Sequence, residues 1–318
     1  MELVAIARNP VPSGAVVGTF RGYDGAPLRY ACFAATRGPR RGTMCLFTGR
    51  TEFIEKYFEV IADLRRRGFA VAIMDWRGQG GSYRPLADRH KGHIRDFSEY
   101  DRDLACFMRD IVLPDCPPPY LALAHSMGGN ILLRNAGAPG TWFERMVLVA
   151  PMIRLHPSQL GLPHPLVRAY AETCSRIGLA RSYTAGSSSK PYELSSFEDN
   201  VLTSDRERYT RNRMLSEAAP HLVLGGPTVG WLRAALRSMA MLNDPSYARR
   251  IGIPLMFFIA GRDTVVEPRA IEDFASRLKV GTHVILANAK HEILQETDDI
   301  RGRFWAAFDA YMGVAAAA

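Results

Sequence analysis

Short apolar runs alternate along the chain with longer segments whose apolar residues recur at helical spacing. Strands are predicted where turn-forming residues bound such runs, over 15–21, 28–33, 44–48, 70–75, 120–124, 146–149, 255–259 and 282–286. The later runs are almost continuously apolar, which is typical of parallel strands covered by helices on both faces. The first two have mixed polarity and are joined by the turn sequence YDGA, which predicts an antiparallel hairpin.

Helical periodicity occupies the intervals between these runs. Helices are predicted over 53–67, 97–112, 130–136, 268–278 and 298–311, the fourth of which opens with a proline. Strands that alternate with helices indicate an α/β protein. We therefore expect a mostly parallel, doubly wound sheet of eight strands.

The alternation stops between residues 152 and 247. This segment has no convincing strand, and connectors rich in proline and serine separate three predicted helices. The first has an apolar stripe of Leu166, Tyr170, Cys174 and Ile177, and the last has one of Val229, Leu232, Leu236, Met239 and Leu242. Because open α/β sheets bind ligands beyond the carboxyl ends of their strands, we interpret 152–247 as a helical cap inserted into a core of 1–151 and 248–318. A separate helical domain is the alternative, which the return of the strand pattern disfavours.

The composition is that of an ordinary soluble protein, with 47% hydrophobic and 23% charged residues. The longest apolar runs, such as IPLMFFIA, are far shorter than the roughly 18–20 residues that span a bilayer. The start, MELVAIARNP, lacks the features of a signal peptide, so we expect a cytoplasmic protein. The five cysteines include no C-x-x-C pair, which argues against a disulfide framework and a zinc site.

The net charge of +8 comes from 40 basic and 32 acidic residues. The basic residues are dispersed and accompany no nucleic-acid-binding motif, so a nucleic-acid partner is not expected. We interpret short basic clusters, such as 65–67, as solvated faces. The open alternative is peripheral contact with anionic lipid at the inner face of the membrane. The sequence indicates no particular oligomeric state.

The stretch LALAHSMGGN, residues 121–130, ends a predicted strand at a serine flanked by small residues. A strand–turn–helix elbow of this kind exposes a serine hydroxyl and points the start of a helix at the reacting group. Ser126 is therefore the candidate nucleophile. A glycine is usual two residues before it, and Ala124 adds one methyl group there, while Gly128 and Gly129 keep the other side of the turn open.

A serine nucleophile needs a general base and an acid that orients the base. Asp263 and His291 each follow a predicted strand, in the order Ser, Asp, His along the chain. His291 would act as general base and then general acid, and Asp263 would fix its tautomer. Weaker alternatives are His125 or His283 as the base and Glu267 or Glu292 as the acid.

The oxyanion of an acyl-transfer intermediate requires two backbone N–H donors. Met127, which follows the nucleophile, is one candidate, and Arg50 in the loop FTGRTE is the other. The stretch DWRGQGGS, residues 75–82, is interpreted as a glycine-rich crossover braced by Asp75 and Arg77. Its alternative role is to line the floor of the site.

With these motifs together, the chain resembles the α/β-hydrolase superfamily. Within it, the chain is most similar to the bacterial lysophospholipases and monoacylglycerol lipases of the serine-aminopeptidase-like branch. The likeness is carried by FTGRTEFIEKY, DWRGQGGS, AHSMGG, AGRDTVVEP and AKHEILQE, in that order. It implies an α/β-hydrolase fold, the triad Ser126, Asp263 and His291, and oxyanion donors at Arg50 and Met127. Departures from the usual pattern are Thr48, Gln79 and Ala124.

The function expected from these residues is that of a serine hydrolase that cleaves carboxylic esters, a lysophospholipid or a monoacylglycerol, through an acyl-enzyme. The acyl chain would lie under the cap against Trp231, Leu232 and Met239. No metal or organic cofactor is implied. Alternatives are an aminopeptidase for N-terminal proline, a cofactor-free perhydrolase, and a non-catalytic binding protein that keeps the fold. An aminopeptidase would need cap carboxylates, for which Glu193, Glu198 and Glu217 are available.

Overall fold

A sheet of eight strands organises residues 2–314, the part of the chain that this computed structural model describes. The strands are β1 (Ala15–Arg21), β2 (Pro27–Phe33), β3 (Thr43–Phe47), β4 (Ala70–Met74), β5 (Tyr120–His125), β6 (Arg145–Val149), β7 (Leu255–Ala260) and β8 (Gly281–Leu286). Every predicted strand is present, and no end is shifted by more than one residue. The apolar runs therefore marked the strands correctly.

The strand order is β1-β2-β4-β3-β5-β6-β7-β8. β1 pairs antiparallel with β2, which pairs antiparallel with β4, and all later pairs are parallel, so the predicted hairpin and the mostly parallel sheet are confirmed. The chain leaves β3 toward β4 on one side and later returns to place β5 on the other. The loops after β3 and β5 diverge at this switch point, which is where open α/β sheets form their ligand crevice.

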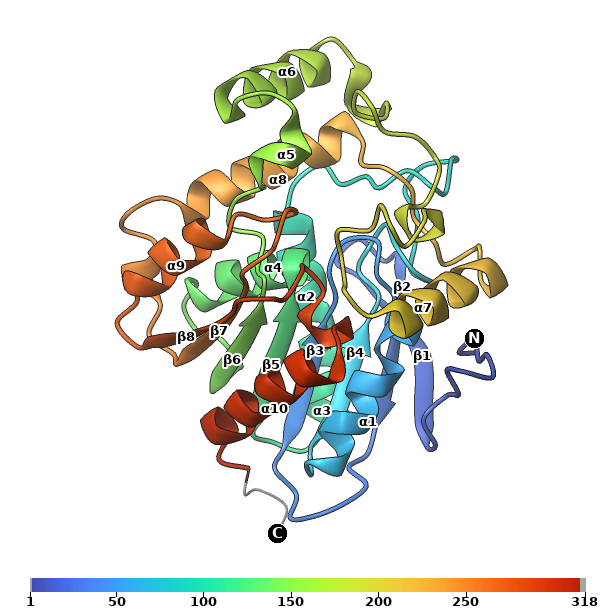
Figure 1. The fold of residues 1–318 in the computed structure, drawn as a ribbon, viewed down its shortest axis with the longest axis vertical. Coiled ribbons are helices and arrows are strands. Elements are labelled where there is room, and N and C mark those ends of the chain that lie inside the picture. Colours follow the sequence, from blue (N-terminus) through green and yellow to red (C-terminus); the bar gives the residue numbers. More distant parts are fainter. Residues whose placement is uncertain (1, 315–318) are drawn as a thin grey trace.

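Helices cover both faces of the sheet (Figure 1). α1 (Phe58–Arg66) and α10 (Asp298–Met312) pack on one face, while α2 (Ser98–Phe107), α4 (Ser126–Ala136) and α9 (Pro268–Ser276) pack on the other. The doubly wound arrangement is thus confirmed. Three helices differ in detail from the prediction. A 3-10 turn (Ile54–Tyr57) precedes α1, a π-helix (Met108–Val112) and a short α3 (Leu113–Asp115) follow α2, and α4 begins at Ser126 instead of residue 130.

The stretch between β6 and β7, which we call the β6–β7 segment (152–247), contains α5 (Pro157–Leu160), α6 (His164–Arg176), α7 (Arg206–Ala218) and α8 (Val229–Leu242). Short 3-10 turns lie at Leu179–Arg181 and Tyr192–Leu194 in the segment, and at Ala248–Arg250 and Ile293–Gln295 after it. α8 packs into the main core, and α6 packs on α8 (Figure 1). Within residues 2–314, no helix has the length and apolarity needed to cross a membrane.

The predicted stripe on α6 does not face inward along its length. Val167 and Ala171 are the buried positions of this helix, whereas Leu166 is 55% exposed and Ile177, just past its end, is 67% exposed. Only a few of the described residues of α6 pack against α8. The helical period therefore correctly placed the stripe residues on one side of the helix, but it did not predict that this side is largely exposed.

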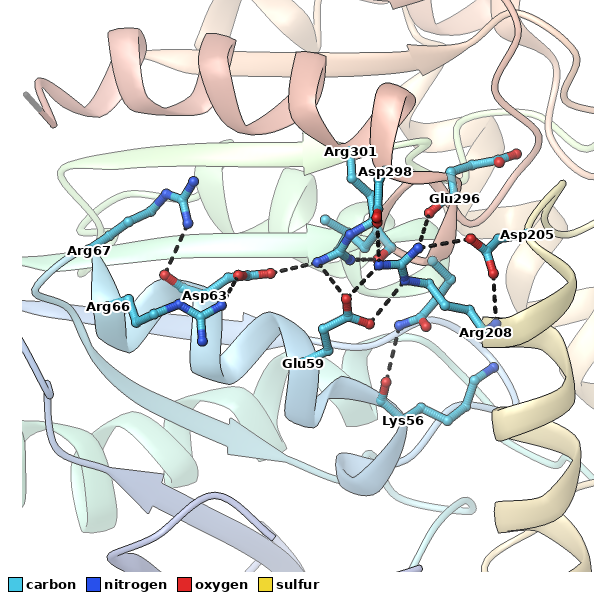
Figure 2. A network of polar contacts seen from close by, with 12 residues as sticks. Lys56, Glu59, Asp63, Arg66, Arg67, Asp205, Arg208, Glu296, Asp298 and Arg301 are labelled. Atoms are coloured by element: carbon cyan, nitrogen blue, oxygen red, sulfur yellow. Dashed lines mark hydrogen bonds and ion pairs between the residues drawn. The ribbon is translucent and has the colours of Figure 1, made fainter. Parts of the chain in front are cut away.

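α7 is fixed to the core by an ionic cluster around Glu59 of α1 (Figure 2). The carboxylate of Glu59 accepts hydrogen bonds from Arg208 at 2.6 Å and from Arg211 at 2.7 Å, both on α7. Arg301 of α10 lies 3.3 Å from the same carboxylate and 2.5 Å from Asp63. Three elements distant in sequence therefore meet at one anion.

Candidate active site

Ser126 is the first residue of α4 and directly follows β5. Its φ of +49° lies in the left-handed region, which a non-glycine residue rarely adopts and which marks a strained turn. The carbonyl of Ser126 accepts a hydrogen bond from the amide of Met152 at 2.9 Å, which braces the turn from the end of β6. The structure thus contains the strand–turn–helix elbow that the sequence predicts.

The two glycines after the serine are required by close packing. A Cβ on Gly128 would lie 2.6 Å from the carbonyl oxygen of Phe47, and one on Gly129 would lie 2.7 Å from Cβ of Pro151. Ala124, by contrast, is fully buried in the core with its methyl group accommodated. Ala124, which replaces the usual glycine, therefore lies on the side of the elbow where a methyl group fits.

The structure brings Ser126, His291 and Asp263 together. The Nε2 atom of His291 lies 3.0 Å from Oγ of Ser126, and its Nδ1 lies 2.7 Å from Oδ2 of Asp263. A carboxylate only accepts, so Nδ1 carries the proton and Nε2 presents a lone pair to the serine hydroxyl. All three side chains are buried, at 7%, 4% and 4% exposure. This arrangement can remove a proton from the serine as its oxygen attacks a carbonyl.

Asp263 is itself held in place. Its Oδ1 accepts hydrogen bonds from the amides of Val265 at 2.7 Å and Val266 at 3.0 Å, which leaves Oδ2 for the histidine. The loop after β7 therefore fixes the carboxylate, while β8, paired with β7, leads into the loop of His291.

The alternative bases and acids are not assembled with Ser126 in this way. His283 is exposed on the edge strand β8, and Glu267 lies 3.6 Å from Arg154 near the surface. Glu292 is buried, but it bonds the Nζ atom of Lys56 at 3.1 Å. His125 lies behind His291, with ring centroids 4.8 Å apart. Among the described side chains, no group of three or more His, Cys, Asp or Glu could hold a metal ion.

The loop 47–52, named the oxyanion loop after its predicted role, lies against Ser126. A Cβ on Gly49 would be 3.2 Å from Cβ of Ser126. Met127 is the second residue of α4, so its amide is one of those without an acceptor inside the helix. The side chain of Arg50 reaches the β6–β7 segment, where Nη2 donates to the carbonyl of Gly225 at 2.6 Å and the guanidinium lies 5.1 Å from the ring centroid of Trp231.

Residues 75–82 brace the oxyanion loop, a role that the sequence reasoning missed. Trp76 donates to the carbonyl of Thr48 at 3.0 Å, and Gln79 donates to the carbonyls of Gly49 at 2.7 Å and Glu52 at 3.0 Å. The glutamine that departs from the family pattern therefore carries two of these contacts. The only sequence feature that could have indicated this role is the position of Gln79 in a glycine-rich crossover next to β3.

The same crossover is braced by charges, as predicted. Asp75 accepts hydrogen bonds from Nε of Arg29 at 2.7 Å and from the amide of Gly81 at 2.7 Å. Arg77 bonds Asp103 at 2.8 Å and Asp24 at 2.8 Å. The pairs of Asp75 with Arg29 and of Arg77 with Asp103 are buried, whereas Asp24 is exposed, and together they brace the crossover.

Glu52 and His125 form a second buried histidine–carboxylate pair, and Glu52 was not singled out by the sequence. Nδ1 of His125 lies 3.1 Å from Oε2 of Glu52. Burial alone would raise the pKa of Glu52, but the charges of His125 and Lys56 outweigh it and hold that pKa well below its usual range. Burial alone would lower the pKa of His125, but Glu52 outweighs burial, so the pKa of this imidazole lies above its usual value.

The loop that carries His291, residues 289–296, is joined to the β6–β7 segment. The loop donates from Glu292 N to Leu202 O at 2.7 Å and from Lys290 Nζ to Asn200 O at 2.9 Å. It accepts at Gln295 O from Thr203 Oγ1 at 2.7 Å and at Glu296 O from Arg208 Nη1 at 3.0 Å, and Figure 2 shows the last of these bonds. The histidine loop and the start of α7 therefore form one hydrogen-bonded unit.

The predicted substrate contacts Trp231, Leu232 and Met239 lie on α8 and are buried in the main core. Ser238 of the same helix donates to Oδ1 of Asn130 at 2.6 Å, one turn along α4 from Ser126. α8 is thus fixed directly onto the helix that begins with Ser126.

Two of the three carboxylates that an aminopeptidase could use, Glu198 and Glu217, are engaged in surface ion pairs. Glu198 bonds Arg206 at 2.7 Å and Glu217 bonds Arg213 at 3.0 Å, and all four side chains are well exposed. The side chain of Glu193 lies outside the part of the chain that the structure describes. The paired carboxylates give no support to recognition of a substrate ammonium group.

Residues 38–298 match the family described as "Serine aminopeptidase, S33". Lysophospholipase L2 of Escherichia coli strain K12 is 33% identical over 293 residues, which cover 89% of this chain and 83% of that protein. A probable lysophospholipase L2 of Haemophilus influenzae is 28% identical, over 82% of this chain and 80% of that protein.

Among solved structures, a soluble variant of monoglyceride lipase from Saccharomyces cerevisiae, in complex with a substrate analog, superposes with a TM-score of 0.74. It is 20% identical to this chain, and the superposition covers 94% of this chain and 96% of the lipase. This likeness confirms the α/β-hydrolase fold. The family match covers most of the chain and includes every predicted site residue, from Arg50 to His291. The chain belongs to the serine aminopeptidase S33 family and is an ester-hydrolysing enzyme with the α/β-hydrolase fold.

Proposed function

We propose that Ser126 attacks the carbonyl carbon of a fatty-acyl ester, with His291 as general base and Asp263 as the residue that orients it. The hydrogen-bonded chain from Asp263 through His291 to Ser126 is the observation that carries this proposal. The proton of the serine hydroxyl passes to Nε2 as the new C–O bond forms, and the imidazolium is stabilised by the carboxylate.

The amides of Arg50 and Met127 would bind the oxyanion of the tetrahedral intermediate. The closeness of Gly49 to Ser126, where an added Cβ would lie 3.2 Å from Cβ of the serine, and the position of Met127 at the start of α4 support this assignment. Collapse of the intermediate breaks the ester C–O bond, and the leaving alcohol takes the proton from His291. Water activated by the same histidine then hydrolyses the acyl-enzyme and restores the serine.

We propose a lysophospholipid or a monoacylglycerol as the substrate. The lysophospholipases and the monoglyceride lipase to which the chain is similar support this substrate class. The β6–β7 segment would form a cap over the site, with the acyl chain against Trp231, Leu232 and Met239 of α8. Their apolar character and the bond that fixes α8 on α4 favour this placement.

We also propose peripheral contact with an anionic membrane through α6 and the turns on either side of it. Leu162, Leu166, Ile177 and Leu179 are large apolar side chains that are 44–67% exposed. Arg168, Arg176 and Arg181 are exposed in the same stretch, and its acidic residue Glu172 is already paired with two arginines of α8. Exposed apolar residues flanked by basic ones suit a bilayer with anionic head groups.

The catalytic proposal is tested with Ser126→Ala and the matched control Ser276→Ala, which changes an exposed serine at the end of α9. We expect Ser126→Ala alone to lose fluorophosphonate labelling and ester hydrolysis, with an unchanged circular dichroism spectrum. A panel of lysophospholipids, monoacylglycerols, p-nitrophenyl esters, a proline anilide and a perhydrolysis assay identifies the substrate class. Full residual esterase activity in Ser126→Ala would overturn the proposal.

A further inference from the structure

A second histidine–carboxylate pair lies directly behind the proposed triad. Oε2 of Glu52 accepts hydrogen bonds from the amide of Gly49, from the hydroxyl of Tyr57 at 2.7 Å and from Nδ1 of His125 at 3.1 Å. Its other oxygen lies 3.8 Å from the ammonium of Lys56. Glu52 is 2% exposed. A buried carboxyl surrounded by donors and one cation is stabilised as the carboxylate.

His125 lies between two groups that can only accept hydrogen bonds. Nδ1 faces the Glu52 carboxylate, and Nε2 lies 3.2 Å from the backbone carbonyl oxygen of His291. A neutral imidazole has one N–H and can satisfy one of these acceptors, whereas an imidazolium donates to both. The geometry therefore corresponds to a protonated His125. Other ionisable groups near the pair are Lys56, Glu292, Tyr57, Asp263 and the ring of His291.

The pair joins two loops that are distant in the sheet. The oxyanion loop follows β3, and the histidine loop follows β8, with three strands between them. Glu52 holds the oxyanion loop through the amide of Gly49, and His125 holds the histidine loop through the carbonyl of His291.

Contact with Gly49 makes this link tight. A Cβ on Gly49 would lie 2.8 Å from Oε2 of Glu52, 3.0 Å from Nδ1 of His125 and 3.2 Å from Cβ of Ser126. The pair therefore packs against the backbone of the oxyanion loop at the same point where that loop meets the nucleophile. A shift of this contact would move the donors of the oxyanion hole relative to Ser126.

We propose that Glu52 and the protonated His125 are positioning residues that set the distance between the oxyanion donors and His291. The inference rests on the proposed serine-hydrolase function. The pair bonds to the backbone of the two loops, His125 to the carbonyl of His291 and Glu52 to the amide of Gly49, while the ring of His125 packs beside that of His291. Their loss should therefore act on the transition state more than on substrate binding.

The kinetic test uses Glu52→Gln, His125→Asn and the double variant. We expect each single change to lower kcat about 10- to 100-fold, because small misplacements of catalytic groups have effects of this size, with KM for a p-nitrophenyl ester nearly unchanged. The double variant should be no worse than the more damaged single one, since the two residues act as one unit. His283→Asn, at an exposed histidine of β8, is the matched control and should keep full activity.

A spectroscopic test does not depend on turnover. Nitrogen-15 NMR of ring-labelled histidine should show one imidazolium that persists above neutral pH and disappears in His125→Asn. In Glu52→Gln the same signal should convert to that of a neutral ring, since the carboxylate that stabilises it is gone. This measurement applies even if His125→Asn fails to fold, because the wild-type spectrum and Glu52→Gln report on the pair.

Two results would overturn the inference. One is a folded Glu52→Gln or His125→Asn protein with kcat within about threefold of the wild type, which misplacement of catalytic groups does not allow. The other is a neutral His125 at neutral pH in the wild-type spectrum. Failure of the wild type to react with fluorophosphonate would instead remove the proposed function, while the NMR result would still decide whether the charged pair exists.

Discussion

Asp263 and His291 meet in a hydrogen bond of 2.7 Å, while two backbone amides hold the second oxygen of Asp263. An asparagine at 263 can keep the amide contacts through its carbonyl oxygen. Its NH₂ group would then face Nδ1 and favour the histidine tautomer in which Nε2 carries the proton. In that tautomer Nε2 cannot accept the proton of the Ser126 hydroxyl.

Asp263→Asn should therefore lower kcat about 10⁴-fold, as the corresponding change does in a serine protease triad, with little change in thermal stability. Steady-state hydrolysis of a p-nitrophenyl ester and a thermal melt measure the two effects. Activity within tenfold of the wild type would show that Asp263 does not orient the base.

Gly128 and Ala124 flank Ser126 but differ in the space around them. A Cβ on Gly128 would lie 2.6 and 2.7 Å from two backbone carbonyl oxygens, which cannot move without displacing β3. Gly128→Ala should cost about 2 kcal/mol or more of unfolding free energy, in the range of overpacked cores. Ala124→Gly should cost about 1 kcal/mol, the usual penalty for glycine in a strand, and keep activity. Urea unfolding of both variants tests this order, and equal stability would contradict it.

The carboxylate of Glu59 should make the free energy of unfolding fall as the solution becomes acidic. Burial alone would raise the pKa of Glu59, but Arg208, Arg301 and Arg211 outweigh burial and lower that pKa from 4.5 to about 2. Since the folded pKa is below the unfolded one, the stabilisation is present above pH 4.5 and is lost as the pH falls toward 2.

Because the side chain of Glu59 is 26% exposed, screening reduces the benefit to about 2 kcal/mol. Glu59→Gln should be less stable than the wild type by this amount at neutral pH. The difference should shrink as the pH falls below about 4.5 in urea titrations. Glu207→Gln, an exposed residue of α7, is the control, and a Glu59→Gln difference that stays constant with pH would refute the assignment.

The exposed apolar residues of the α6 region predict binding to anionic vesicles. Leu166→Ser combined with Ile177→Ser should weaken sedimentation with phosphatidylglycerol vesicles by at least about tenfold, because the two changes together remove more than about 1.4 kcal/mol of apolar transfer free energy. Val280→Ser, at an exposed apolar residue before β8, should bind as the wild type does. Equal binding of the double variant, or equal binding to neutral phosphatidylcholine, would argue against this surface.

Most of the fold could be predicted because its physical signals are local. Buried parallel strands must be apolar throughout, so their runs stand out, and the polar residues that follow them converge at one edge of the sheet. This is why Ser126, Asp263 and His291 could be predicted to meet although 165 positions separate the serine from the histidine.

The remainder depends on tertiary contacts. Glu52 and His125 are 73 positions apart, and neither lies at a motif position that demands the other. The period of α6 showed which residues share a face, but no local signal shows whether another element covers that face. The sequence SMGG lacks apolar periodicity, so the first turn of α4 was not recognised as helical.

At Ser126, whose backbone is left-handed, a substitution that improves stability is expected to abolish hydrolysis. Glycine there would relieve strain of about 1–3 kcal/mol and would forgo a serine–histidine hydrogen bond that contributes about 1 kcal/mol. A laboratory selection for heat resistance alone would therefore tolerate, or even favour, loss of the proposed nucleophile. Engineering this enzyme for thermostability requires a selection that also reports hydrolysis.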